Sequence, residues 1–138
     1  MKDPALHPIV AKMMDQDAFS QWLDIQILES GAGFCTCQLT VRDDMVNGFG
    51  IAHGAIPYAL ADSTLAFAVN AKGRHAVSVT STIQHFAPIM VGDVLTSKAT
   101  LRSEGGRIVH VDVEVVNQSA KLVASVTATG TKRSTHWT

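Results

Sequence analysis

Residues 53–71, HGAIPYALADSTLAFAVNA, decide which fold the chain can adopt. Nearly all of them favour an α-helix, which Lys72 and Gly73 then end. Apolar side chains surround the helix axis instead of forming one stripe, which predicts burial on most sides. Pro57 is compatible with this helix because it falls near the first turn, where backbone N–H groups lack intrahelical partners. We therefore expect residues 53–71 to form the central helix of the fold.

Segments typical of β-strands lie on both sides of this helix. In residues 107–117, valines alternate with His110, Asp112 and Glu114, as in a strand with one buried face and one solvated face. Residues that favour turns, such as Gly105 with Gly106, separate the segments. The expected strands are residues 22–29, 34–41, 76–86, 94–103, 107–117 and 121–130.

The order of these elements predicts the fold class. Residues 1–20 carry apolar side chains at helical spacing and are expected to form a short N-terminal helix. An apolar helix between strand segments must be covered by their sheet. We therefore expect an α+β fold in one domain, residues 1–138, with an antiparallel sheet of about six strands wrapped around the central helix.

Composition and charge exclude several classes of protein. Hydrophobic residues make up 46% of the chain and charged residues 17%, which excludes a disordered protein. The formal net charge is -1 and no basic run exceeds Lys132–Arg133, so we expect no nucleic-acid partner. No apolar run is long enough to span a membrane, and residues 1–4 do not resemble a secretory signal. We expect a cytoplasmic protein with no membrane partner.

The two cysteines give no sign of a disulfide or a metal site. Cys35 and Cys37 are expected to lie on one face of a strand, where neighbouring side chains bridge poorly. Two free, core-filling thiols are the prediction. The histidines do not supply the spacing that would complete a metal site, so no metal is expected.

Asp62 is the one ionisable residue in the apolar helix. Burying a polar group without partners costs about 2 to 7 kcal/mol, and an ionised carboxylate costs more. One interpretation is an N-cap after a break in the helix, or a solvent-facing position on a narrow polar edge with Thr64 and Asn70. The other is a catalytic or ligand-binding carboxylate whose basicity is raised by partial desolvation.

The segment that leads into the helix, residues 47–54 (NGFGIAHG), is a second candidate. Its glycines permit close approach of the backbone, and the start of a helix presents N–H groups that stabilise negative charge. Such donors contribute about 2.7 to 4 kcal/mol when they face the oxyanion of an acyl-transfer reaction. An ordinary Asn-Gly loop is the alternative.

Side chains around these two candidates could complete a binding site. Ser78, Thr80 and Thr82 alternate along one strand and are expected to share one face, either as a binding surface or as a solvated one. Aromatic residues are candidates for lining a substrate pocket, with ordinary core positions as the alternative. They are Phe49, Tyr58 and Phe86.

The arrangement of Asn47, His53-Gly54, Asp62 and Ser78 resembles the hot-dog thioesterase superfamily. Within it, the chain is most similar to the PaaI-like acyl-CoA thioesterases, a subfamily named after phenylacetic acid degradation. The resemblance extends over residues 22–133, and its most specific part is the spacing of seven residues from Asn47 to Gly54 and eight from Gly54 to Asp62. Family members often have a second glycine where this chain has Ala55.

This resemblance implies an antiparallel sheet wrapped around a helix, assembly into homodimers and commonly homotetramers, and hydrolysis of acyl-CoA without a metal or prosthetic group. Coenzyme A enters as part of the substrate. By position, the Gly54 N–H polarises the thioester carbonyl, Asp62 is the nucleophile or general base, and Asn47 orients water or the carboxylate. Ser78 assists, and His53 matches the motif. Thr80 and Phe49 are expected at the substrate.

The acyl group and the type of reaction remain open at this point. The family suggests an aromatic acyl group such as phenylacetyl or hydroxyphenylacetyl, or a medium-chain acyl group. A hot-dog hydratase or dehydratase that recruits His53 is an alternative, as is a non-catalytic acyl-CoA-binding module.

A distance argument predicts a site shared between subunits. Eight helical residues separate Gly54 from Asp62 by roughly 12 Å along the axis, which is too far for both to contact one carbonyl group. Two helices packed antiparallel about a twofold axis would bring Gly54 of one chain beside Asp62 of the other.

Overall fold

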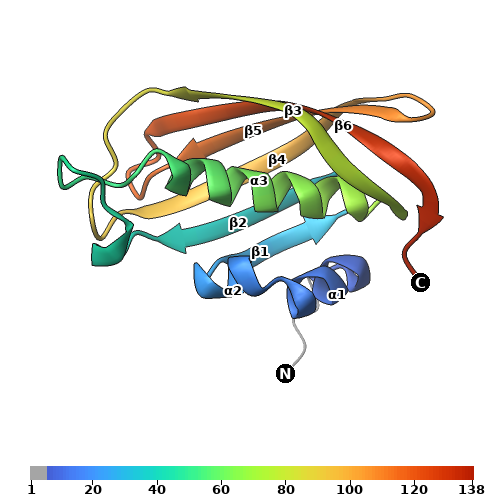
Figure 1. Cartoon of the computed structure of the whole chain (residues 1–138), viewed down its shortest axis with the longest axis horizontal. Helices are drawn as coiled ribbons and strands as arrows, with labels where there is room; N and C mark the ends of the chain where they lie inside the picture. The colour runs from blue at the N-terminus through green and yellow to red at the C-terminus, as the bar shows by residue number, and fades with distance from the viewer. Residues whose placement is uncertain (1–5) are drawn as a thin grey trace.

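The computed structural model describes residues 6–138. A six-stranded antiparallel sheet in the order β1-β2-β4-β5-β6-β3 curves around one long helix, α3 (Figure 1). The predicted fold class, an α+β fold with a central helix and short helical structure at the N-terminus, is confirmed. The elements are α1 (Pro8–Gln16), α2 (Ala18–Trp22), β1 (Gln26–Gly31), β2 (Phe34–Thr40), the 3-10 helix η1 (Asp43–Met45), α3 (Ala55–Asn70), β3 (Arg74–His85), β4 (Val94–Glu104), β5 (Ile108–Val116) and β6 (Leu122–His136).

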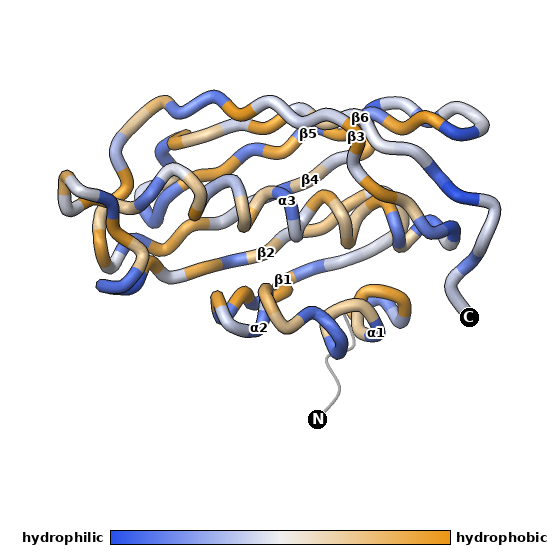
Figure 2. The backbone as a smooth tube through the Cα atoms, in the orientation of Figure 1, coloured by the Kyte–Doolittle hydropathy of each residue, from blue (hydrophilic) through white to orange (hydrophobic). Residues whose placement is uncertain are grey.

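Helix α3 lies on the concave face of the sheet, where it packs mainly against β2, β4 and β5. Most of its residues are apolar along the whole length of the helix (Figure 2), as the sequence predicts. Buried residues occur on successive positions such as Leu60, Ala61, Thr64 and Leu65, because sheet and N-terminal helices cover different sides of the helix. The buried Thr64 hydroxyl bonds to the Leu60 carbonyl and to another buried hydroxyl on β4, so this polar group has partners.

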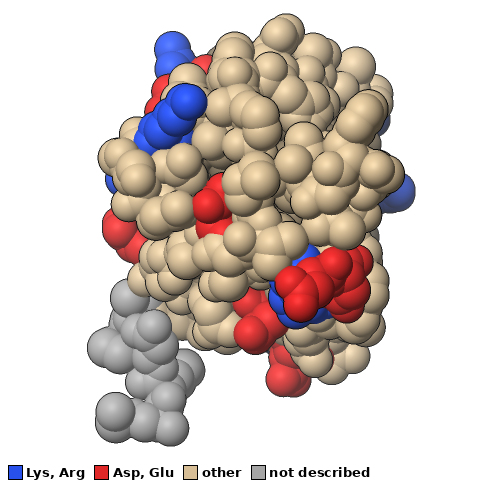
Figure 3. Space-filling model, turned by 90° about the vertical axis from the view of Figure 1, so that its left-hand side faces the viewer, with Lys and Arg blue, Asp and Glu red and all other residues tan. Residues whose placement is uncertain are grey.

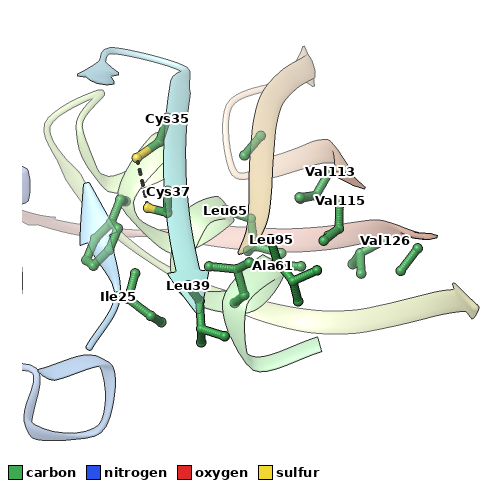
Figure 4. Packing of buried hydrophobic residues seen from close by; sticks show 14 of the residues in the cluster. Ile25, Cys35, Cys37, Leu39, Ala61, Leu65, Leu95, Val113, Val115 and Val126 are labelled. Carbon is green, nitrogen blue, oxygen red and sulfur yellow. Dashed lines mark hydrogen bonds between the residues drawn. The ribbon is translucent and has the colours of Figure 1, made fainter. Parts of the chain in front are cut away.

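Cys35 and Cys37 lie side by side in this core, with their sulfur atoms 3.7 Å apart (Figure 4). Both thiols are free and buried, as predicted from their positions on one face of β2. The hydrogen bond with the Cys37 thiol, together with burial, raises the pKa of Cys35, which favours its protonated form. The pair therefore fills space in the core.

The N-terminal segment differs from the single helix expected over residues 1–20. Residues 1–5 lie outside the described part, and the rest forms two helices separated at Asp17, whose backbone leaves the helical region. The Asp17 carboxylate accepts hydrogen bonds from the backbone N–H of Ser20 at 2.9 Å and from its hydroxyl at 2.6 Å. Asp17 thus ends one helix and caps the next.

Strand β6 extends further than predicted, to His136 instead of residue 130. The tail is held by Trp137, whose backbone N–H donates to the Gly73 carbonyl and whose indole N–H donates to Asn70 Oδ1 at 2.9 Å. Its ring also packs against His75, with centroids 4.5 Å apart. These contacts fix the connection between α3 and β3.

Within residues 6–138, the structure contains no helix of the length and apolar character needed to cross a membrane. The same residues contain no cluster of three or more side chains suited to hold a metal ion.

Candidate active site

Asp62 and Ser78 line one cavity of about 230 Å³ between α3 and the end of the sheet formed by β3, β5 and β6. Most of the remaining wall is apolar, from residues such as Leu65, Val69 and Val109. The cavity therefore offers an apolar chamber with one carboxylate and one hydroxyl.

Asp62 is half-buried, and its environment favours the protonated form. Burial raises the pKa of Asp62 above its ordinary value, and the nearby negative charge of Asp17 raises it further. Within the described residues, no group donates a hydrogen bond to the Asp62 carboxylate. The interpretation of Asp62 as an N-cap is wrong, because it lies in the middle of α3. It is a carboxylate with raised basicity beside an apolar cavity.

Asp17 comes close to this carboxylate through contacts between α2 and α3. The Ser20 hydroxyl, which donates to Asp17, also bonds to the Ser63 hydroxyl at 2.8 Å. Ser63 is the neighbour of Asp62 in α3. The cap of α2 therefore brings a second negative charge toward Asp62, a feature that only the packing of the two helices reveals.

If Asp62 is the base or nucleophile that the family resemblance implies, replacing Asp17 by Asn should shift the acid limb of the pH–rate profile of thioester hydrolysis to lower pH. The Asn side chain still caps α2, because its oxygen can accept from the Ser20 N–H, but it carries no charge. Without that charge the pKa of Asp62 falls, so Asp62 is ionised at lower pH. The measurement is kcat against pH for wild type, D17N and the exposed control D15N. An acid limb that stays in place or moves to higher pH in D17N would contradict this electrostatic coupling.

Asn47 and Gly54 line a different, open groove of about 400 Å³ at the start of α3, together with Pro57, His85 and Phe86. Figure 3 shows the end of the molecule that lies at the left of Figure 1, and most of that surface is uncharged.

The first turn of α3 leaves one backbone donor available. The Ala55 N–H donates to His53 Nδ1 at 3.0 Å, and the Ile56 N–H donates to the His53 carbonyl at 2.9 Å. Pro57 has no N–H. The Gly54 N–H has no partner within residues 6–138. It is therefore free to bind a negatively charged or carbonyl oxygen, and the His53 side chain caps the helix beside it.

Asn47 shapes the loop that borders this groove. Its side-chain oxygen accepts from the Phe49 N–H at 2.9 Å, and its backbone bonds to Gly50 and Ile51. The amide Nδ2 is left as the group that can reach a ligand. Phe49 itself lines neither cavity, and its side chain is 90% exposed, so within one chain it does not approach the candidate site. Tyr58 packs against the core, whereas Phe86 lines the groove.

The expectation that Ser78, Thr80 and Thr82 share one face of a strand is wrong. A bulge lies between Ser78 and Thr80 of β3, so the alternation of side chains reverses there. Ser78 pairs with the buried Gly130 on the concave face, whereas Thr80 pairs with Thr129 and lines a separate depression on the outer face with Thr82. Only Ser78 of these hydroxyl residues lines the cavity of Asp62.

The predicted site residues thus form two separate groups within one chain. Asp62 and Ser78 share the apolar cavity, and Asn47 and Gly54 share the groove, but neither space is lined by both Asp62 and Gly54. Two polar side chains not predicted for the site also line these spaces, Asn70 in the cavity and His85 in the groove. Asn70 is the last residue of α3 and His85 is the last residue of β3. At such positions the periodic pattern of apolar residues no longer indicates which way a side chain points.

Comparisons with known proteins identify relatives over most of the chain. Residues 49–124 match the family model described as the thioesterase superfamily. The acyl-coenzyme A thioesterase PaaI of Escherichia coli strain K12 is 38% identical over 112 residues, which cover 81% of this chain and 80% of that protein.

Solved structures agree with these matches. The structure of the E. coli PaaI protein from the phenylacetic acid degradation operon superposes with a TM-score of 0.90 at 34% identity and covers 93% of each chain. A hypothetical thioesterase protein from Streptococcus pneumoniae TIGR4, solved with coenzyme A, superposes with a TM-score of 0.82 at 26% identity, covering 88% of this chain and 95% of that one. The resemblance to the hot-dog thioesterase superfamily is confirmed, and the chain belongs to the thioesterase superfamily, with its hot-dog fold.

Proposed function

We propose that this enzyme hydrolyses acyl-CoA thioesters to a free acid and coenzyme A. Its 38% identity to the acyl-coenzyme A thioesterase PaaI of E. coli, over most of both chains, supports thioester hydrolysis. The solved relative that carries coenzyme A supports a CoA thioester as the substrate. The observation that carries the proposal is the combination of a half-buried carboxylate without hydrogen-bond donors, Asp62, and a free N–H at the start of an apolar helix, Gly54.

In the proposed reaction, the Gly54 N–H binds the thioester carbonyl oxygen and stabilises the negative charge that develops on it. Asp62 either attacks the carbonyl carbon and forms an anhydride, or removes a proton from an attacking water molecule. The C–S bond then breaks and its electron pair leaves with the thiolate of coenzyme A, a good leaving group that needs no strong acid. Asn47 Nδ2 orients the water or the carboxylate, and Ser78 assists beside Asp62. No metal or prosthetic group is required.

The two halves of the site are joined in this proposal by a second copy of the chain. Strand β3 is an edge of the sheet, and it exposes Val77 and Val79, with 48% and 65% of their surface accessible. An apolar, unpaired edge favours association with another strand. A homodimer about a twofold axis would place Gly54 of one protomer beside Asp62 of its partner and create two equivalent sites. A homotetramer would pair two such dimers.

The apolar cavity next to Asp62 is proposed to hold the acyl group. Its volume of about 230 Å³ and its largely apolar walls support this placement. By the family resemblance, the expected acyl groups are phenylacetyl, hydroxyphenylacetyl and medium-chain acyl groups.

A panel of acyl-CoA thioesters, assayed for release of free thiol, tests this function. We expect saturable thiol release with phenylacetyl-CoA or with medium-chain acyl-CoA. A hydratase would modify the acyl chain without releasing thiol, and a non-catalytic binding module would bind the thioesters without turnover. Either result would overturn the proposal.

The Gly54 N–H can be removed with little change to the backbone. Gly54 has φ -57° and ψ -22°, a conformation that proline adopts, and its N–H has no intrachain partner to lose. We expect G54P to lower kcat by about a hundredfold, as for the loss of one oxyanion donor. The matched control is G54A, which keeps the N–H and adds a Cβ whose nearest neighbours lie at 3.4 and 3.5 Å. If G54P is as active as G54A, the N–H does not bind the carbonyl oxygen.

A further inference from the structure

His85 stands next to the candidate oxyanion donor. It is the last residue of β3, and it lines the same groove as Asn47 and Gly54. A Cβ built on Gly54 would lie 3.4 Å from His85 Cε1 and 3.5 Å from Nε2. The Nε2 edge of the imidazole ring therefore faces the open side of the Gly54 Cα.

This position puts Nε2 within reach of an oxygen bound to the Gly54 N–H. A Cβ lies about 2.5 Å from its own backbone nitrogen, so His85 Nε2 is no more than about 6 Å from the Gly54 nitrogen. Two N–H donors that share one carbonyl oxygen lie about 5 Å apart when each N–H···O distance is about 2.9 Å and the two bonds follow its lone pairs. This separation is within the limit set by the position of His85. One carbonyl oxygen can thus accept from both groups.

The His85 imidazole also differs from those of other histidines in its hydrogen bonding. His53, His75 and His110 each bond through Nδ1 to a neighbouring backbone or hydroxyl group. Within residues 6–138, neither ring nitrogen of His85 has a hydrogen-bond partner. Its side chain is exposed in the groove and needs no role in the core.

We propose that His85 is a second oxyanion donor, whose Nε2–H binds the thioester carbonyl oxygen together with the Gly54 N–H. This inference rests on the proposed acyl-CoA hydrolysis. When the new C–O bond forms at the carbonyl carbon, the carbonyl electron pair moves onto the oxygen, where both N–H groups stabilise it. When the C–S bond breaks, the carbonyl re-forms and coenzyme A leaves as the thiolate. His85 keeps its proton throughout.

Two substitutions separate hydrogen bonding from shape. H85F keeps a planar ring but removes the donor, and H85Q keeps an N–H donor on a flexible side chain. We expect H85F to lower kcat by about 10- to 100-fold, the lower part of the range for oxyanion donors because the groove is open. KM should change less than about threefold, because the bond strengthens as the oxyanion forms. H85Q should recover at least about a tenth of wild-type kcat, because its amide restores one donor.

The controls make each outcome decisive. H110Q replaces an exposed histidine on the outer face of β5 and should match wild type. If H85F loses the wild-type thermal unfolding transition, H85L supplies the donor-free comparison. Wild-type kcat in H85F or H85L, or equal losses of kcat in H85Q and H85F, would overturn the proposed role of His85. Neither result would affect the proposed acyl-CoA hydrolysis. A wild-type enzyme that releases no thiol from any acyl-CoA would instead overturn the proposed function and this role with it.

Discussion

Asp62→Asn should lower kcat for thioester hydrolysis by about 10²- to 10⁴-fold, the range expected when a general base or nucleophile is lost. The substitution keeps the size of the side chain and removes its ability to attack a carbon or accept a proton. Asp62 is the carboxylate in the apolar cavity, and it has no donor within residues 6–138 that would hold it in a purely structural role. The measurement is steady-state thiol release with the acyl-CoA that wild type prefers.

Asp15→Asn is the matched control, because Asp15 is an exposed carboxylate on α1 and lines neither the cavity nor the groove. Its kcat should equal that of wild type. A fall of less than about tenfold in D62N would remove Asp62 from the chemistry. Single-turnover hydrolysis in heavy-oxygen water then separates the two mechanisms for wild type. Label in the Asp62 carboxylate indicates direct attack, and label only in the released acid indicates activated water.

The D62N variant should also be more stable than wild type near neutral pH. Because burial raises the pKa of Asp62, the folded protein binds the proton more tightly than the unfolded chain does. The stability of wild type therefore falls as pH rises from the ordinary pKa of an aspartate through the raised value, whereas the uncharged amide in D62N carries no such cost. Thermal unfolding should show a higher Tm for D62N at neutral pH and a difference that shrinks at acid pH. A lower Tm for D62N at neutral pH would show that ionised Asp62 stabilises the fold.

The central helix could be predicted closely because its apolar pattern lies within one continuous stretch of sequence. Residues 53–71 are apolar on all sides, and α3 spans 55–70. The ends differ because His53 and Gly54 form the cap, which depends on one side-chain hydrogen bond. The N-terminal region is less predictable, since the change of direction at Asp17 rests on a cap that competes with the continuous helical pattern around it.

The site could be predicted only where a residue conflicts with its surroundings. Asp62 stands out against an apolar helix, and Gly54 stands out at its start. The bulge between Ser78 and Thr80 leaves no mark in the sequence, because alternation with two hydroxyl residues looks the same with or without an extra residue. The approach of His85 to Gly54 depends on how β3 ends over the start of α3, which is a tertiary contact.

Complementation between two inactive variants tests the shared site most directly. Asn47 and Gly54 line the groove of one chain, and Asp62 lines a separate cavity of the same chain. In a mixed dimer of N47A and D62A, one site therefore carries both substitutions, and the other combines intact Asn47 and Gly54 with intact Asp62. After complete exchange of an equal mixture, half of the dimers are mixed, so about a quarter of all sites should be intact.

The measurement is thiol release from the exchanged mixture, with exchange verified by mass spectrometry of differently tagged protomers. Each variant alone should retain less than about one hundredth of wild-type activity, as expected for the loss of a group that acts in the transition state. We predict that the mixture recovers about a quarter of wild-type activity, by the symmetry of the twofold dimer. Activity that stays at the average of the two separate variants, despite complete exchange, would contradict a site built from Gly54 of one protomer and Asp62 of its partner.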